Sequence, residues 1–418
     1  MRRRFPVFPI LSASAAVALA TVMGLPSGGA APLRPDTARV SAPDGPSVDR
    51  IAIFGADDRV PLPADRAGLN ASVGLIYEPG SQSVCTAFCV GDDVAATAGH
   101  CLFRTAGERA PRLPGFTFRL SPKGAPDAVS RIAGTRQGGA PQNVAAGTLN
   151  LRVRPPIDAS SDWALMRLET PICKGRSLPL SRQPADKLVE LSTAQRVYQV
   201  SYHRDFGNWE LALGHPCAIR RSFAGADWDT ISKDFTDARH VILHTCDTGE
   251  ASSGSPMLID GPAGPEVVGI NVGTYLQSRV LTQQGKIVHR YKSKTVANTA
   301  VSADAFRGVL DVLGRAEILV ARDDMKSLQR LLASEGYPVG AADGLYGPKL
   351  STAIRAFEQA EGRSETGLAT AELLKRLSAR DAERRGGQPG PYQSLHIETG
   401  SVGGYDADRG KRARRPAR

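Results

Sequence analysis

The sequence is poor in aromatic residues and cysteines, and it has no long apolar run beyond its first thirty residues. Aromatic residues make up only 6% of the 418-residue chain. No later segment reaches the roughly 20 consecutive apolar residues that a helix needs to span a bilayer, so no membrane span is expected there. The six cysteines lack a zinc-ligand pattern, because Cys85 and Cys89 have no matching downstream pair. The sequence therefore predicts no metal ion and no other cofactor.

Glycine, proline and positive charge are, in contrast, abundant. The 43 glycines and 29 prolines favour a loop-rich β architecture over long helices. Lys and Arg number 52 against 42 Asp and Glu, which gives a formal net charge of +10. Such a charge favours anionic surroundings, for example a cell-wall polymer, a membrane surface or nucleic acid. No nucleic-acid-binding motif and no basic patch with interleaved aromatics accompanies it, so nucleic acid is not expected as a partner.

The first thirty residues have the features of an export signal. A positive start, MRRRF, precedes the apolar stretch ILSASAAVALATVMGL, and PSGGAA supplies small residues for cleavage after Ala30. Residues 1–30 are therefore predicted to be a signal peptide; the alternative is an uncleaved membrane anchor. Export would take the chain to the periplasm, the cell wall or the medium. In such an oxidising space an even number of cysteines favours disulfides over free buried thiols.

Two folded regions are expected in the remainder of the chain. Residues 49–312 contain short apolar runs, such as DWALMRLE and EVVGINVGTY, broken by turn residues, a pattern typical of β-barrels or a β-sandwich. Residues 324–378 contain three short helical patterns. The other segments lack apolar periodicity and are predicted to be linkers at 31–48 and 313–323 and a disordered basic tail at 379–418.

The segment HTCDTGEASSGSPM contains three candidate nucleophiles, Ser252, Ser253 and Ser255. A serine hydroxyl is inert at neutral pH unless a base takes its proton and hydrogen-bond donors receive the resulting oxyanion. The sequence offers His100, in VAATAGHCLF, as the base, and Asp162, at the start of DWALMRLE, as an acceptor for an imidazole N–H. Taken singly, each motif has an ordinary alternative: a polar turn, a loop histidine and a strand-capping aspartate.

The three motifs TAGHC, DWALMRL and SSGSP, in this order, resemble the chymotrypsin superfamily and are most similar to its bacterial glutamyl-endopeptidase-like branch. The stretches IAIFGADDRVPL, CTAF and DTGEASSGSP also match, so the resemblance covers about residues 50–310. It implies an all-β, trypsin-like fold of two six-stranded antiparallel barrels with the active site between them. His100 would be the general base, Asp162 its orienting partner and Ser253 the nucleophile.

The resemblance also assigns an oxyanion hole to the N–H groups of Ala251 and Ser253. The family usually has glycine where this chain has Ala251, because that residue must adopt a left-handed conformation. A left-handed alanine costs about 1–2 kcal/mol, whereas the loss of one oxyanion donor costs about 3–4 kcal/mol. If the fold holds Ala251 in place, activity survives. If the peptide flips, the enzyme is badly impaired.

Primary specificity is not readable from the sequence. The resemblance places Asp247, Thr248 and Asn271 at the specificity pocket. Asp247 could select Lys or Arg, or its carboxylate could point into the structure, because DT is common in this branch without trypsin-like preference. Asn271 stands where a histidine is associated with glutamate preference. Ser252 replaces the aspartate that binds a freed N-terminus in the trypsin-like animal enzymes, so that kind of zymogen switch is not expected.

The cysteines predict disulfides around the two barrels. Cys85 lies sixteen residues before Cys101, close enough for a bridge that would fix the loop carrying His100. Cys217 and Cys246 flank the strands that lead to the nucleophile loop and are paired on that ground. Cys89 and Cys173 pair by elimination only, and Cys89 as a buried thiol is the alternative.

The C-terminal helical region, with its GYPVG, DGLYG, TAIRAFEQ and TGL motifs, closely resembles the peptidoglycan-binding domain of bacterial wall hydrolases. Its apolar positions are expected to be core. Tyr346 and Arg355 are the candidate peptidoglycan contacts, with ordinary packing and a solvated charge as the alternatives. The basic tail could hold wall polymer or anionic lipid, which, with an uncleaved signal segment, is the only membrane contact expected.

These observations predict an exported serine endopeptidase that hydrolyses proteins or peptides through an acyl-enzyme and is localised by binding peptidoglycan. Two other functions stay open at this stage. One is a catalytically inactive envelope-binding protein, suggested by Ala251, and the other is a hydrolase of peptidoglycan cross-links.

Overall fold

The computed structural model describes residues 52–103, 112–121, 125–135, 140–194, 197–223, 227–277, 280–283, 286–290 and 294–386. The chain divides into two units, Met1–Pro43 and Asp44–Arg418. The first unit, which contains the predicted signal peptide, lies outside the described residues, as does most of the basic tail. The predicted domain boundaries within the second unit stay predictions. None of the described helices is long and apolar enough to cross a membrane.

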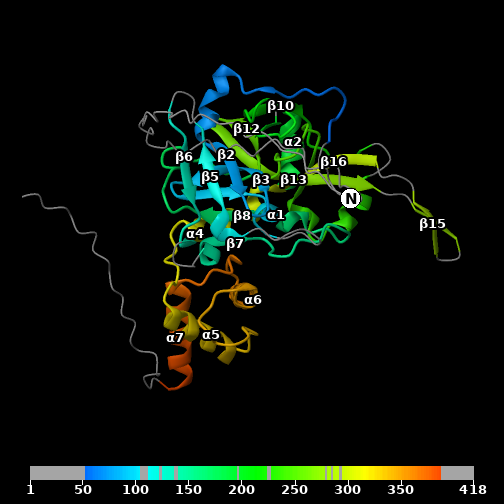
Figure 1. Ribbon diagram of the computed structural model, residues 1–418. Helices are drawn as coiled ribbons and strands as arrows, with labels where there is room; N and C mark the ends of the chain where they lie inside the picture. The colour runs from blue at the N-terminus through cyan, green and yellow to red at the C-terminus, as the bar shows by residue number, and fades with distance from the viewer. Residues whose placement is uncertain are drawn as a thin grey trace, which may run out of the picture. The chain divides into compact units, whose positions relative to one another are not determined.

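The first β-sheet closes into a six-stranded antiparallel barrel (Figure 1). The ring is completed where Ala133 donates its N–H to the Arg167 carbonyl (2.9 Å) and Glu169 donates to the Arg131 carbonyl (2.8 Å). A further short strand, β7, pairs with the start of β8. Apolar side chains that alternate along the strands, such as Phe118, fill the interior. The strands, in sheet order, are β6 (Ala128–Arg131), β5 (Thr117–Leu120), β2 (Val73–Glu78), β3 (Ser83–Gly91), β4 (Val94–Thr97), β8 (Ala164–Arg167) and β7 (Val144–Ala146).

The second sheet closes in the same way. Its ring is completed by the hydrogen bonds from Arg220 N–H to the Leu243 carbonyl (3.0 Å) and from Thr245 N–H to the Ala218 carbonyl (3.1 Å). The outer strand β1 pairs with β10. The strands, in sheet order, are β1 (Val60–Pro61), β10 (Ala212–Cys217), β9 (Val197–Ser201), β12 (Pro256–Gly261), β13 (Gly264–Gln277), β16 (Lys294–Ser302) and β11 (Val241–His244). The predicted pair of six-stranded antiparallel barrels is therefore confirmed, with one additional strand on each.

Short helices and one ribbon connect these strands. The ribbon is formed by β14 (Val280–Gln283) and β15 (Lys286–Arg290). The α-helices of this region are α1 (Gly99–Leu102), α2 (Ala185–Ala194), α3 (Trp228–Ile231) and α4 (Arg307–Leu313). The 3-10 helices are η1 (Ala64–Ala71), η2 (Leu113–Gly115), η4 (Ala140–Asn143), η5 (Ala159–Ser161), η6 (Ser232–Asp234), η7 (Ala238–His240) and η8 (Ala303–Ala305).

All six cysteines form disulfides, in the pairs that the sequence analysis predicts. Two of the three bridges lie in the first barrel and its connections. The third joins β10 to the segment that follows β11 and leads to Ser253. The pairs are Cys85–Cys101, Cys89–Cys173 and Cys217–Cys246. Each one joins segments that the barrels already bring together, which restricts the unfolded chain more than the folded one.

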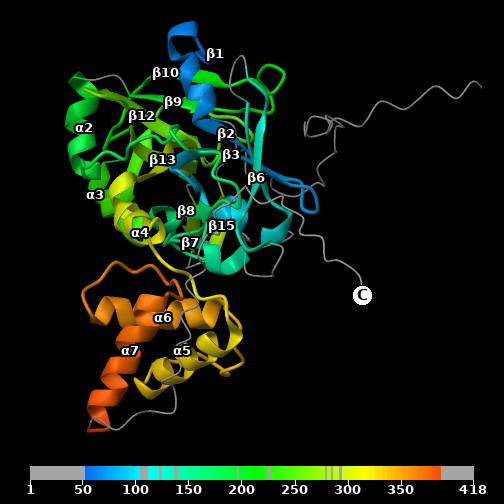
Figure 2. The same cartoon turned by 90° about the vertical axis from the view of Figure 1, so that its left-hand side faces the viewer.

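The C-terminal region is a three-helix module, as predicted, with α5 (Arg322–Ser334), α6 (Pro348–Ala360) and α7 (Ala371–Arg384) (Figure 2). Its helices enclose a separate apolar core that includes Leu328, Leu332, Ile354, Phe357 and Leu377. The turn before α6 depends on Gly344, which has a φ of +75°. A Cβ there would lie 2.4 Å from Arg322 Cγ and 2.6 Å from its carbonyl oxygen, so the close approach requires glycine.

Candidate active site

His100 and Asp162 form a tightly bonded pair. His100 lies in α1, a single turn that follows directly after β4, and Asp162 lies between η5 and β8. One carboxylate oxygen of Asp162 accepts the backbone N–H of His100 and the other bonds its ring Nδ1, both at 2.8 Å. Asp162 is buried, and the His100 side chain is 10% exposed. This geometry makes Nδ1 the protonated ring nitrogen and leaves the Nε2 lone pair available.

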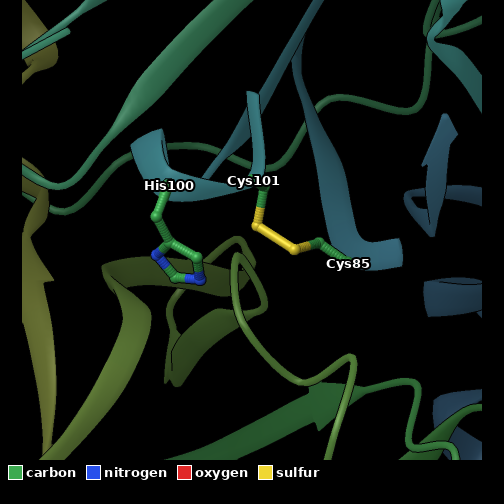
Figure 3. Close-up of side chains that lie close together, drawn as sticks. All are labelled: Cys85, His100 and Cys101. Atoms are coloured by element: carbon green, nitrogen blue, oxygen red, sulfur yellow. A yellow bond between two sulfur atoms is a disulfide. The ribbon is translucent and has the colours of Figure 1, made fainter. Parts of the chain in front are cut away.

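Two local features hold this pair. Gly99 lies against Asp162, where an added Cβ would be 3.1 Å from the Oδ1 atom, so glycine lets the carboxylate approach the turn closely. The Cys85–Cys101 disulfide ties α1 to β3 (Figure 3). The two sulfur atoms and one imidazole nitrogen lie within 4.8 Å of one another. Because the sulfurs are bonded together, they offer no thiolate to a metal ion.

The loop that carries Ser253 packs against the same end of the first barrel. Thr86, on β3, donates its N–H to the Ser253 carbonyl (2.9 Å) and its hydroxyl to the Ala251 carbonyl (2.8 Å). A Cβ on Gly254 would lie 2.2 Å from the Thr86 carbonyl oxygen and 3.0 Å from the N of Ala98, two residues before His100. The loop and the turn bearing His100 are therefore in direct contact.

Ser253 itself has a free hydroxyl. Within the described part of the chain, its Oγ makes no hydrogen bond, and none joins it to His100 Nε2. The neighbouring serines differ: Ser252 Oγ donates to the Gly249 carbonyl (2.7 Å) and Ser255 Oγ donates to the Ser252 carbonyl (2.6 Å). Of the three serines, Ser253 alone keeps a hydroxyl available, and unliganded sites often lack a short nucleophile–base bond.

The turn before Ser253 presents two N–H groups without partners. Ala251 has a φ of +76°, the left-handed conformation expected from the sequence. The N–H groups of Ser252 and Ser255 bond to carbonyls within the loop, whereas those of Ala251 and Ser253 bond to no described residue. Two such N–H groups on one turn can donate hydrogen bonds to an oxyanion.

Asn271, one of the predicted specificity-pocket residues, is bonded within the protein. It is 2% exposed, and its amide donates to the Ser252 carbonyl (3.1 Å). Its Oδ1 lies 3.2 Å from the Nε2 atom of His244, a buried histidine on β11. The side chain therefore supports the loop that carries Ser253, and its placement at a specificity pocket stays a prediction.

Asp247 and Thr248 are also turned into the protein. Asp247 is 2% exposed, and its two oxygens accept the N–H groups of Phe54 (2.7 Å) and Asp58 (3.1 Å). The Thr248 hydroxyl accepts from Asn298 Nδ2 (3.0 Å) and is equally buried. The Asp247 carboxylate therefore points into the structure, while the placement of both residues at a specificity pocket stays a prediction.

Two buried histidines were not identified from the sequence. His203 Nδ1 accepts the N–H of Gly249 (3.1 Å), which leaves its Nε2–H to donate to Ser201 Oγ (2.7 Å). His244 Nδ1 accepts the N–H of Cys246 (3.3 Å). Both therefore hold the chain that leads into the Ser253 turn. Each is a single histidine in or beside an apolar strand, and such a pattern carries no functional signal.

The candidate peptidoglycan contacts are both half-buried. Tyr346 donates its hydroxyl to the Gly367 carbonyl (2.7 Å). Arg355 donates to the carbonyl groups of Ala146 and Gly147. The polar atoms of both side chains thus bond within the chain, as in the ordinary-packing alternative.

Comparison with known proteins gives two findings. Residues 321–377 match the family model described as a putative peptidoglycan binding domain. Among solved structures, the chain is similar to a thermostable serine protease, AL20, from an extremophilic microorganism, with 17% identity and a TM-score of 0.36. That match covers 57% of this chain and 95% of the other. No curated protein matches the chain.

Acidification is expected to destabilise the fold through His203 and His244. Burial lowers the pKa of each from its ordinary 6.5 to about 4. The unfolded chain takes up these protons near pH 6.5, so the stability is complete above that pH and is lost as the pH falls towards 4. The loss should approach about 3 kcal/mol per histidine. Urea unfolding of the wild type and of His203→Asn and His244→Asn between pH 7 and 4.5 measures it, and equal pH dependence in all three would contradict it.

Replacing Ala251 by glycine is expected to stabilise the protein. Glycine adopts positive φ without the alanine penalty, so the free energy of unfolding should rise by about 1 kcal/mol. Ala95→Gly in β4 is the matched control, because there glycine only weakens a strand. Thermal unfolding of both variants provides the measurement, and destabilisation by Ala251→Gly would show that the turn is not strained.

Proposed function

We propose that this protein is a serine endopeptidase that acts outside the cytoplasm and is held at peptidoglycan by its C-terminal module. The observation that carries the proposal is the contact between two preorganised parts. One is the doubly bonded His100–Asp162 pair, and the other is the Ser253 turn with its unpaired N–H groups. Their meeting at one end of the first barrel supports a nucleophilic mechanism.

In the proposed reaction, His100 Nε2 takes the proton of Ser253 Oγ as that oxygen attacks a peptide carbonyl. The new C–O bond turns the carbonyl oxygen into an oxyanion, which accepts the N–H groups of Ala251 and Ser253. Asp162 stabilises the imidazolium and keeps its ring in place. His100 then gives its proton to the leaving amine as the C–N bond breaks. A water molecule hydrolyses the acyl-enzyme by the same steps in reverse.

Ala251 supports an active enzyme in this proposal. A flipped peptide would turn its N–H away from the oxyanion and remove one donor, at a cost of roughly 100- to 1000-fold in rate. The Ala251 N–H shares its peptide with the Glu250 carbonyl, which accepts the N–H of Arg204 (2.8 Å), and this bond opposes such a flip. The inactive envelope-binding alternative loses its main support.

Peptidoglycan is the proposed location and protein the proposed substrate. The family match over residues 321–377 and the net charge of +10 both favour attachment to the wall. Three disulfides are typical of an oxidising space, such as the periplasm or the wall exterior. Attachment would raise the effective concentration of the enzyme near envelope proteins without wall cleavage being its reaction.

A fluorophosphonate probe tests the nucleophile. Labelling is expected in the wild type and should be abolished in Ser253→Ala. In His100→Ala it should fall by at least about 100-fold, because the Ser253 hydroxyl then has no base to take its proton. Ser255→Ala is the matched control and should label normally. In-gel fluorescence and intact-mass spectrometry provide the readout. An unlabelled wild type, or labelling that survives Ser253→Ala, would contradict the assignment.

Binding to purified sacculi tests the module in the full-length chain. Ile354→Asp places a charge in the module core and should abolish co-sedimentation, whereas Leu345→Asp at an exposed position should not. Both variants should keep fluorophosphonate labelling, because the barrels have their own core. Retained binding by Ile354→Asp would contradict attachment through the module. Release of muropeptides by the wild type would instead favour a hydrolase of peptidoglycan cross-links.

A further inference from the structure

The segment from Ala52 to Leu62, which we name the N-terminal brace, crosses the start of the nucleophile loop. Ala52 and Thr248 exchange two backbone hydrogen bonds, of 3.1 and 3.0 Å. Farther along, β1 pairs with β10, and Leu62 donates its N–H to the Leu211 carbonyl (2.9 Å). The brace is thus fixed to the second barrel at both of its ends.

Asp247 anchors the middle of the brace. Its buried carboxylate accepts one backbone N–H from Phe54 and one from Asp58. A buried carboxylate is stable only when hydrogen bonds or charges compensate it, and here backbone groups of the brace do so. Asp247, the first residue of the loop that carries Ser253, is therefore bonded to the brace.

Arg59, the next residue of the brace, has a buried side chain that pairs with two partly exposed aspartates. Its side chain is 4% exposed and bonds both oxygens of Asp57, at 2.9 and 2.7 Å. It also bonds both oxygens of Asp205, at 3.1 and 2.8 Å, and its guanidinium lies 5.4 Å from the ring centroid of Phe206. Bidentate pairs of this kind fix orientation as well as charge.

The Arg59–Asp205 pair packs against Gly249. A Cβ at Gly249 would lie 2.2 Å from Asp205 Oδ1 and 2.9 Å from Arg59 Nη1, so a larger residue there would displace the ion pair. On its other sides, the N–H of Gly249 bonds His203, and its carbonyl accepts both the N–H (3.1 Å) and the hydroxyl (2.7 Å) of Ser252. Gly249 therefore lies between the ion pair on one side and the Ser252 turn on the other.

We infer that the brace is a positioning device for the oxyanion turn, with Arg59 as its principal positioning residue. Ala251 holds a conformation that costs about 1–2 kcal/mol, and a turn under this strain relaxes unless packing prevents it. Arg59 and Asp205 prevent it through Gly249, and so keep the N–H groups of Ala251 and Ser253 aligned. This inference rests on the proposed function, since it concerns the rate of the same reaction.

The test compares two ways of disturbing one contact with a matched disturbance elsewhere. Arg59→Ala removes the ion pair, and Gly249→Ala pushes against it from the other side. Arg66→Ala is the control: Arg66 lies just beyond the brace and bonds both oxygens of Asp260, at 2.5 and 2.6 Å, but does not touch the nucleophile loop. Arg59→Lys keeps the charge without the bidentate geometry.

The measurement separates positioning from stability. Saturation kinetics of fluorophosphonate labelling, well below each variant's melting temperature, give a binding constant and a maximal rate constant. Arg59→Ala and Gly249→Ala should lower the maximal rate constant by about 10- to 1000-fold, the upper end being the loss of one oxyanion donor, with the binding constant changed less than about threefold. Arg59→Lys should lie between the wild type and Arg59→Ala. Arg66→Ala should lower the melting temperature but leave both constants unchanged.

Three results would overturn the inference. The first is a wild-type rate constant in Arg59→Ala or in Gly249→Ala, and the second is an equal loss in Arg66→Ala. The third is a loss confined to the melting temperature in every variant. If Arg59→Ala does not fold, Gly249→Ala and Arg59→Lys give the decision. A wild type that resists labelling altogether refutes the proposed function instead, and the inference with it.

Discussion

The two hydrogen bonds that Asp162 accepts from His100 are the constraint on which the rest of the site depends. One bond fixes the backbone of a four-residue turn and the other fixes the ring within that turn. Because both come from a single buried carboxylate, the imidazole cannot rotate without losing its partner inside the protein. The proposed proton transfer needs only the remaining nitrogen, so the fold has already determined which nitrogen that is.

The fold and this pair could be predicted because their signals are local and repeated. Short apolar runs with turn residues predict many strands, and three motifs in a fixed order resemble one family. The helical module carries several glycine-containing motifs, and a family model matches it. One cysteine pair follows from its short spacing and one from the strands that it flanks, whereas Cys89 and Cys173 are paired by elimination only. Each of these signals can be recognised in a single sequence because it involves many residues or a fixed spacing.

Substrate preference could not be predicted, because the position of a residue in the sequence does not show where its side chain points. Asp247 could select a basic residue only if its carboxylate faced solvent. It faces the N-terminal brace instead, which lies almost 190 residues away in the sequence and carries no motif that pairs it with the loop. The buried His203 and His244 escaped notice for a related reason, since a single histidine looks the same whether it supports a turn or faces water.

The substitution of alanine for glycine at position 251 connects these two results. A glycine in this turn would adopt its conformation at no steric cost, whereas Ala251 must be held in it by its surroundings. The surroundings are unusually complete: Thr86 holds its carbonyl, Asn271 bonds the next residue, and Gly249 is confined by the Arg59 cluster.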